Sequence, residues 1–421
     1  METPSSMYRR SSNGGFRVSE SSCAYRREMS SRTQDVQDSY QRVVVSDKDT
    51  SEDDMPRGWI SLRSCVQLIV SFISGMVFGL AAEKARVFEP HIIREQMLFT
   101  NFTMLKMFLS AAASGMLGFS LLNMIPATQD QFDYVVDGFI VSMMTKSVAS
   151  AALGGALLGC GMAVAGACPG MVPAQIGAGV PEAVYTVVGG LCGAYLYALT
   201  GPALARKLQP RKPYRYFTLD EFLGSPYFII ALPMVATLST VVLAVEMVRP
   251  WSLEVEQSGS GLVESRAWPP FVAGALIGLL QVPTVLSLST TLGTTTGYMT
   301  MAAQVLILKP LRSLFSHLQS FQRGIHNWWQ VFYMGGSVVG AHLSAQASGT
   351  FGSVGGVVPP QSFLGGVLMI YGARLAGGCS SGHGLSGMGL LMLMSLVAVP
   401  FMFAGGMSAA FFMKHMLEIE M

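Results

Sequence analysis

The sequence predicts an all-α polytopic membrane protein with about nine transmembrane helices. Hydrophobic residues make up 51% of the 421 positions and charged residues only 12%, unlike a soluble domain. Residues 147–181, 267–308 and 324–373 contain no Asp, Glu, Lys or Arg. Each of these stretches is long enough to cross about 30 Å of hydrocarbon, which places the chain in the membrane class.

Nine apolar runs of spanning length follow one another along the chain. Between them, residues 83–100, 171–180 and 285–308 are too short or too broken to cross. Irregular backbone is tolerated at membrane depth only where protein or water covers it, so we expect re-entrant short helices there. The nine predicted spans are 59–82, 102–124, 148–168, 182–204, 226–248, 268–284, 326–347, 361–378 and 388–413.

Residues 1–57 differ from the rest of the chain. They are rich in Ser, Arg, Asp and Glu and poor in large aliphatic residues, which predicts a disordered Ser-rich tail. They lack the apolar core of a signal peptide, and their many acids argue against a transit peptide. The net charge of +2 averages this tail with a nearly uncharged body, so nucleic acid is not implied as a partner.

The loop charges predict an orientation. Five Lys and Arg residues lie within 205–216, whereas 249–266 holds three Glu and two Arg. By the positive-inside rule, the first loop is cytoplasmic and the second is outside, which puts the N-terminal tail in the cytoplasm. Lys84, Arg86 and Arg94 then fall on the outer side, against the rule.

One sequence motif occurs twice. Residues 154–168 align without a gap on 365–379, matching at two leading glycines, a mid-helix glycine, an Ala-Gly step and the final cysteine. If each copy belongs to a repeat of four spans and a single span links them, the second repeat is inverted, as in many transporters. We therefore expect a membrane repeat at 58–205, a basic loop, linking helix and acidic loop at 206–267, and a second repeat at 268–415.

A broken, glycine-rich loop follows each copy of the motif. Such loops expose backbone N–H groups, and successive amides form a concave nest that binds anions. We predict that the two loops meet at one central site for a small divalent anion; the alternative is a packing kink with a structural cysteine. The candidate residues are Cys168, Gly170 and Gln175 in the first loop and Gly378, Cys379, Ser380, Ser381 and His383 in the second.

Arg374 is the only Arg, Lys, Asp or Glu between Arg323 and Lys414. A charge within a span is costly, so Arg374 either supplies positive potential to the pathway or satisfies loop carbonyls. His383 either binds substrate or is a structural donor. No second Cys or His lies at metal-ligand spacing, and no Cys-His-Asx arrangement for hydrolysis is present. We expect no enzyme, cofactor or metal.

The six cysteines are predicted to be free thiols. Five of them lie in apolar or glycine-rich stretches. Cys160 and Cys168 would be about 12 Å apart on a shared helix, beyond the reach of a disulfide.

Residues 165–170 and 372–387 resemble the two signatures of the YeeE/YedE sulfur transport family, and 78–88 resembles its segment after the first helix. The resemblance implies an inner membrane-type transporter of inverted repeats that passes thiosulfate or a related sulfur anion between cysteine thiols. Cys168 and Cys379 match its two loop cysteines. Bacterial members also tend to have a cysteine after the first helix, where this chain has none. Either Cys160 takes the place of this missing cysteine or the substrate differs. The long tail suggests a eukaryotic member.

These observations together predict a membrane transporter for thiosulfate or a related inorganic sulfur anion, bound by loop amides and passed between thiols. The alternatives are a membrane sulfurtransferase that forms a persulfide on Cys379, which requires a low-pKa thiolate near Arg374, and an anion channel. The expected partners are the sulfur anion and the lipid bilayer, and a cytosolic sulfur-acceptor protein is a further candidate.

Overall fold

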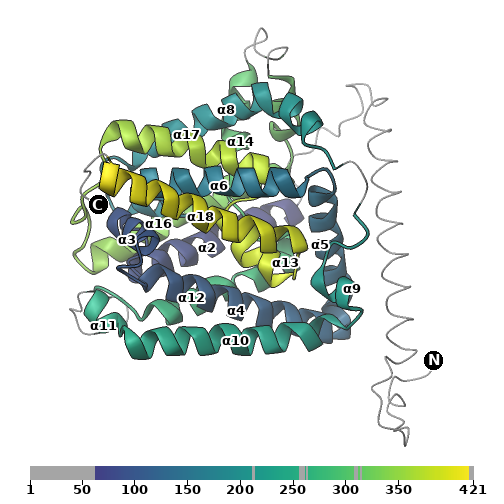
Figure 1. Cartoon of the computed structure of the whole chain (residues 1–421), viewed down its shortest axis with the longest axis horizontal. Coiled ribbons are helices and arrows are strands. Elements are labelled where there is room, and N and C mark those ends of the chain that lie inside the picture. Colours follow the sequence, from purple (N-terminus) through teal and green to yellow (C-terminus); the bar gives the residue numbers. More distant parts are fainter. Residues whose placement is uncertain are drawn as a thin grey trace, which may run out of the picture.

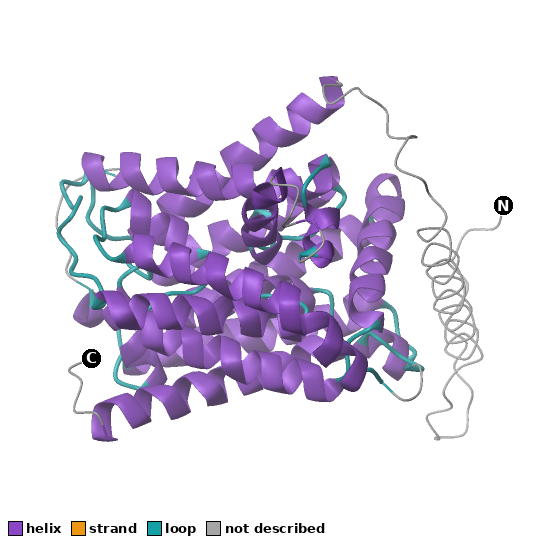
Figure 2. Ribbon diagram, turned by 90° about the horizontal axis from the view of Figure 1, so that it is seen from above, coloured by secondary structure: helices purple, strands orange, loops and turns teal. Residues whose placement is uncertain are grey.

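The described chain is almost entirely helical in a computed structural model (Figures 1 and 2). No named β-strand occurs in this part, and only Thr218 and Met392 form an isolated bridge. The predicted tail lies outside the described residues. The structure describes residues 62–210, 214–255, 261, 264–307, 312 and 315–416.

Long helices alternate with short ones along the chain. The long helices are α2 (Leu62–Lys84), α4 (Thr103–Met124), α5 (Pro126–Met144), α6 (Val148–Ala165), α8 (Ala183–Lys207), α10 (Tyr227–Val248), α16 (Ile325–Ala347), α17 (Pro359–Ala376) and α18 (Leu393–Met416). The short elements are α3 (Pro90–Met97), α7 (Met171–Gly177), α9 (Leu219–Leu223), α11 (Trp251–Glu254), α12 (Pro270–Leu279), α13 (Gln281–Leu288), α14 (Thr295–Ala303), η1 (Gln304–Ile307), η2 (Ser316–Phe321) and η3 (Gly382–Gly387).

Seven helices in the described residues are long and apolar enough to cross a membrane. They are α2, α4, α6, the first part of α8, α10, the broken pair α12–α13 and α18. The other two predicted spans, 326–347 and 361–378, form the helices α16 and α17 but are not among the seven. Polar side chains such as Asn327 and Gln330 in α16 are buried against other helices. The all-α polytopic fold is confirmed.

The sequence pattern predicted no helix where α5 lies. Asp130, Asp133 and Asp137 interrupt the apolar pattern there, so no spanning run is visible. These residues are spaced three and four apart and therefore share one face of the helix. Pro126 occupies the first turn, where its missing N–H has no intrahelical partner to lose.

The three segments that were too broken to cross contain short helices. Residues 83–100 contain α3, residues 171–180 contain α7, and residues 285–308 contain the end of α13, α14 and η1. Ser289 ends α13 in the left-handed conformation.

Helices from the two halves of the chain pack against each other. The closest pairs are α2 with α16, α4 with α12, α6 with α17 and α18, and α8 with α17. A Cβ at Gly75 would overlap the backbone of Tyr333 in α16, and a Cβ at Gly274 would overlap the backbone of Met107 in α4. Small residues thus bring the backbones together, as is usual in membrane interiors. Figure 1 shows α17, α6 and α18 side by side.

The helices α6 and α17, which carry the repeated motif, form the centre of this packing. Gly154 of α6 lies against Ala376, and Gly365 of α17 lies against Ala165, so the two helices are antiparallel. Gly166 (φ 59°) ends α6 and Gly377 (φ 95°) ends α17 in the left-handed conformation, which favours glycine. These caps turn the chain from each helix into its cysteine loop.

Candidate anion site at two cysteine loops

The two cysteine loops meet inside the protein. The Ser380 side chain of the second loop lies close to the Cys168 thiol of the first loop, and the two cysteines lie within electrostatic range of each other. Only 7% of Cys168 and 1% of Cys379 is exposed. The five described cysteines are all free thiols.

Backbone amides surround both sulfur atoms. The amides of Gly170 and Met171 interact with the Cys168 sulfur. In the second loop, the Gly382 amide donates to Cys379 Sγ at 3.4 Å, and the Ser381 hydroxyl lies 3.1 Å from the same atom. The two loops therefore present similar donors at equivalent places.

Hydroxyl groups from other helices complete the surroundings. Thr294 Oγ1 lies 3.6 Å from Cys379 Sγ. Tyr298 of α14 and Tyr333 of α16 lie within electrostatic range of both cysteines, and the Tyr298 hydroxyl donates to the carbonyl of Pro169 at 3.4 Å. Sequence reasoning missed both tyrosines because nothing in their local pattern separates them from core aromatics.

Each cysteine loop is tied to the broken segment of its own half of the chain. In the first half, Gln175 Nε2 donates to the carbonyls of Phe88 (2.8 Å) and Gly166 (2.9 Å). In the second half, the Ser386 hydroxyl donates to the carbonyl of Leu292 at 2.9 Å and accepts from Gln281 Nε2 at 2.8 Å. Gln175 thus holds loop backbone in place.

A cavity of about 490 Å³, the α5 vestibule, opens on Cys379. Arg374, Lys146 and His326 contribute its basic groups, and Gly378 also lines it. None of its lining residues in the described part of the chain is an Asp or Glu. The other walls come from α5, the end of α13, the start of α14, α16 and the second cysteine loop.

Two cations lie together in this vestibule. Lys146, between α5 and α6, donates to the carbonyl of Arg374 at 3.0 Å and lies 3.3 Å from the Tyr197 hydroxyl. The Arg374 guanidinium lies over the rings of Phe321 (5.0 Å) and Tyr197 (5.8 Å). Burial lowers the pKa of Lys146 to about 8, and the charge of Arg374 acts in the same direction. Of these two cations, only Arg374 was predicted from the sequence.

A second cavity of about 560 Å³, the α3 vestibule, lies near α3 and α11. Figure 1 shows these helices at the end of the molecule opposite α5. Arg86 lines it and pairs with Glu89 and Glu83, while Glu254 pairs with Lys106 at 2.9 Å. No cysteine lines this vestibule within the described residues.

The remaining candidate residues lie beside the loops. The Cys160 thiol donates to the carbonyl of Gly405 in α18 at 3.2 Å and lines neither vestibule. His383 is buried, its Nδ1 lies 3.0 Å from the Ser395 hydroxyl, and its Nε2 has no hydrogen-bond partner among the described residues. A Cβ at Gly378 would lie 3.1 Å from that ring, so the histidine packs under the loop.

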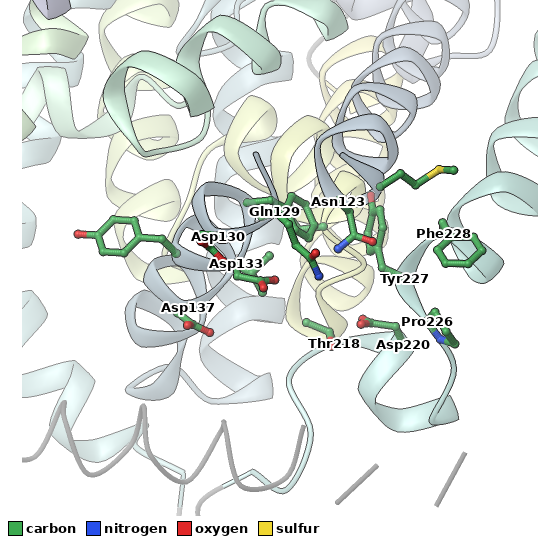
Figure 3. A pocket seen from close by; sticks show the side chains of 15 residues that line it. Asn123, Gln129, Asp130, Asp133, Asp137, Thr218, Asp220, Pro226, Tyr227 and Phe228 are labelled. Atoms are coloured by element: carbon green, nitrogen blue, oxygen red, sulfur yellow. The ribbon is translucent and has the colours of Figure 1, made fainter. Parts of the chain in front are cut away.

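A third cavity, of about 910 Å³, is acidic (Figure 3). Asp130, Asp133 and Asp137 of α5 and Asp220 of α9 line it. At 100° per residue, these α5 positions lie on the face away from those that line the α5 vestibule. The carboxylates repel anions, so this cavity is not suited to a sulfur anion.

Comparison with known proteins identifies the family. The Sulphur transport family matches residues 84–408, which include both cysteine loops and both vestibules. A similar curated protein is the thiosulfate transporter TsuA of Escherichia coli (strain K12), which is 27% identical over 271 residues, covering 61% of this chain and 72% of that protein. Because the family match spans most of the sequence, the chain belongs to the Sulphur transport family.

Proposed function

We propose that the protein carries thiosulfate or a related inorganic sulfur anion across a membrane, using the two cysteine loops as the central site. Family membership supports a membrane sulfur-anion transporter. The similarity to a thiosulfate transporter supports the narrower substrate class. In this proposal the backbone amides hold the charge and the thiols of Cys168 and Cys379 pass the anion from one loop to the other.

The meeting of the two loops is the observation that carries this proposal. The Ser380 side chain of one loop reaches the Cys168 thiol of the other, with amides at both sulfur atoms. A thiol is a weak hydrogen-bond donor, and amides carry only partial charge. Such a site binds an anion without the tight ion pair that would slow its release.

The helix pairing supports two inverted repeats at 58–205 and 268–415. The first helix of the first repeat, α2, packs on α16, and the first helix of the second repeat, α12, packs on α4. Likewise, α6 packs on α18, and its counterpart α17 packs on α8. A two-fold relation between the repeats requires this exchange of partners. Because the single span α10 links the two repeats, the second repeat has the opposite orientation in the membrane.

The proposed orientation puts the α5 vestibule in the cytoplasm. Tyr214, in the basic loop 205–216, accepts a hydrogen bond from the backbone of Val148 at the start of α6, so this loop lies at the α5 end. The positive-inside rule favours the cytoplasm for such a loop. The α3 vestibule then faces outside.

Uptake of radiolabelled thiosulfate into proteoliposomes tests the function. We expect Cys168→Ala and Cys379→Ala each to reduce uptake at least about tenfold, because each removes a thiol from the handover. Cys192→Ala, at an exposed position on α8, is the matched control. Full transport by the double variant Cys168→Ala/Cys379→Ala would contradict the proposal. Competition by sulfite, sulfate and selenite would define the substrate.

Mass spectrometry of the purified protein distinguishes a carrier from a sulfurtransferase. Attack of the Cys379 thiolate on the outer sulfur of thiosulfate would form a persulfide and release sulfite. That persulfide adds about 32 Da to the protein. A carrier leaves the mass unchanged after incubation with thiosulfate, whereas the adduct on Cys379 would favour the enzyme.

A further inference from the structure

We infer that Lys146 and Arg374 form a second anion station in the α5 vestibule, which binds a divalent sulfur oxoanion by charge before it meets, or after it leaves, the Cys379 thiol. This inference rests on the proposed transport function. It assigns the recognition of charge to a place separate from the two cysteine thiols.

The two cations have no counter-ion in the described residues. Lys146 Nζ donates to the Arg374 carbonyl, and the aromatic side chains of Tyr197 and Phe321 also lie close to the pair. Aromatic faces attract cations but do not neutralise them. Two like charges at a partly desolvated place repel each other, and a bound anion of charge −2 would balance both.

The pair also has hydrogen-bond donors to spare. Arg374 Nε is buried and has no hydrogen-bond partner in the part of the chain that the structure describes. A guanidinium offers five N–H donors in a planar fork that matches the oxygens of an oxoanion, and an ammonium offers three more. The oxygens of thiosulfate suit these donors, while its terminal sulfur suits a thiol.

The station lies directly beside the cysteine loop. A Cβ at Gly377 would lie 3.3 Å from Lys146 Cγ, so the lysine side chain packs on the first residue of that loop. Gly378 and Cys379 follow in sequence, and all three line the same vestibule as Lys146 and Arg374. An anion held by the two cations therefore needs only a short displacement to reach Cys379.

The protonation of Lys146 makes the station sensitive to pH. The titratable groups around it are Arg374 of α17, Tyr197 of α8, His317 of η2, His326 of α16 and the loop histidine of η3. None is a carboxylate. Since the pKa of Lys146 is about 8, the station has both charges at neutral pH and loses one as the pH rises through 8. Anion binding should weaken over that interval.

Calorimetric titration of thiosulfate into the purified Cys168→Ala/Cys379→Ala variant isolates the station from the thiols. We expect residual binding at pH 7 that weakens by up to about tenfold at pH 9, because the protonated fraction of Lys146 falls by about that factor. Adding Lys146→Met should abolish the residual binding, whereas Lys146→Arg should keep it and remove its pH dependence. The matched control is Arg215→Gln, an exposed cation at the same end of the molecule.

The outcomes separate this inference from the proposed function. Absence of residual binding at pH 7, or binding that Lys146→Met leaves unchanged, overturns the station even where the cysteine variants abolish uptake. Conversely, full uptake by the double cysteine variant would contradict the passage of the anion between thiols. The station would still stand if that variant shows binding that depends on Lys146 and on pH. Gel filtration and thermal unfolding of each variant exclude loss of the fold as the cause.

Discussion

The two vestibules differ in whether their cationic side chains have carboxylate partners. In the α5 vestibule, Lys146 and Arg374 lie together without a carboxylate among the described lining residues, and the cavity reaches Cys379. In the α3 vestibule, Arg86 pairs with Glu83 and Glu89, and no described cysteine lines the cavity.

This difference separates charges that hold the protein together from charges that are available to a ligand. A buried cation with a carboxylate partner is already neutralised, so it stabilises a local structure and attracts anions weakly. A pair of cations without a counter-ion keeps its potential for a substrate. The α5 vestibule therefore carries positive charge that no described carboxylate lining it offsets, whereas Arg86 and Glu254 in the α3 vestibule already have partners of opposite charge.

Breaking the ion pairs at the α3 end should have the largest effect on stability. Glu83 is fully buried, lies 3.3 Å from both Lys84 and Arg86, and accepts hydrogen bonds from Ser344 (2.7 Å) and Thr350 (2.8 Å). Glu83→Gln leaves the buried Lys84 without its carboxylate partner and removes one of the two partners of Arg86, so we expect a loss of about 3–5 kcal/mol in unfolding free energy, measured by denaturant unfolding in detergent.

The control for this change is Glu264→Gln, which removes an exposed carboxylate in the loop 249–266. It should leave the unfolding free energy unchanged within error. Lys146→Met, which removes an unpaired cation, should not lower it either. A loss after Lys146→Met as large as that after Glu83→Gln would erase the distinction between the two vestibules.

Replacing Gln175 or Ser386, which tie the two cysteine loops to the broken segments, should have intermediate effects on stability. Each effect should be confined to one end of the molecule. Gln175→Leu leaves the buried carbonyls of Phe88 and Gly166 without their donor, and Ser386→Ala does the same to Leu292. We expect each to cost about 1–3 kcal/mol. Hydrogen exchange should rise around Phe88 in the first variant and around Leu292 in the second; a rise at both ends in either variant would show that the two loops are not held separately.

Replacing Cys160 should have the smallest effect. Its thiol is engaged by the carbonyl of Gly405 and lines neither vestibule. We expect Cys160→Ala to lower thiosulfate uptake less than about twofold, whereas the loop cysteines lower it at least about tenfold. A reduction equal to that of Cys168→Ala would instead make Cys160 part of the thiol pathway.

Sequence patterns predicted the helices better than the vestibules. A long apolar run can be identified without knowing which helices it packs against. The structure accordingly has a helix at every predicted span. The helix α5 was missed because its three aspartates, which line the acidic cavity, break the apolar pattern. Lys146 was missed because it is a single loop residue, and only the fold of α5 against Gly377 gives it a position beside Arg374.

The membrane class, the repeated motif and the two cysteine loops can be read from the sequence alone, because hydrophobic length and glycine-rich breaks act locally along the chain. The long-range contacts come from the tertiary structure alone: Ser380 lies close to Cys168, Tyr298 and Tyr333 lie within electrostatic range of both thiols, and Lys146 lies beside Arg374. These contacts join residues far apart in the sequence, and their distances depend on how closely glycine-lined helices from the two halves pack.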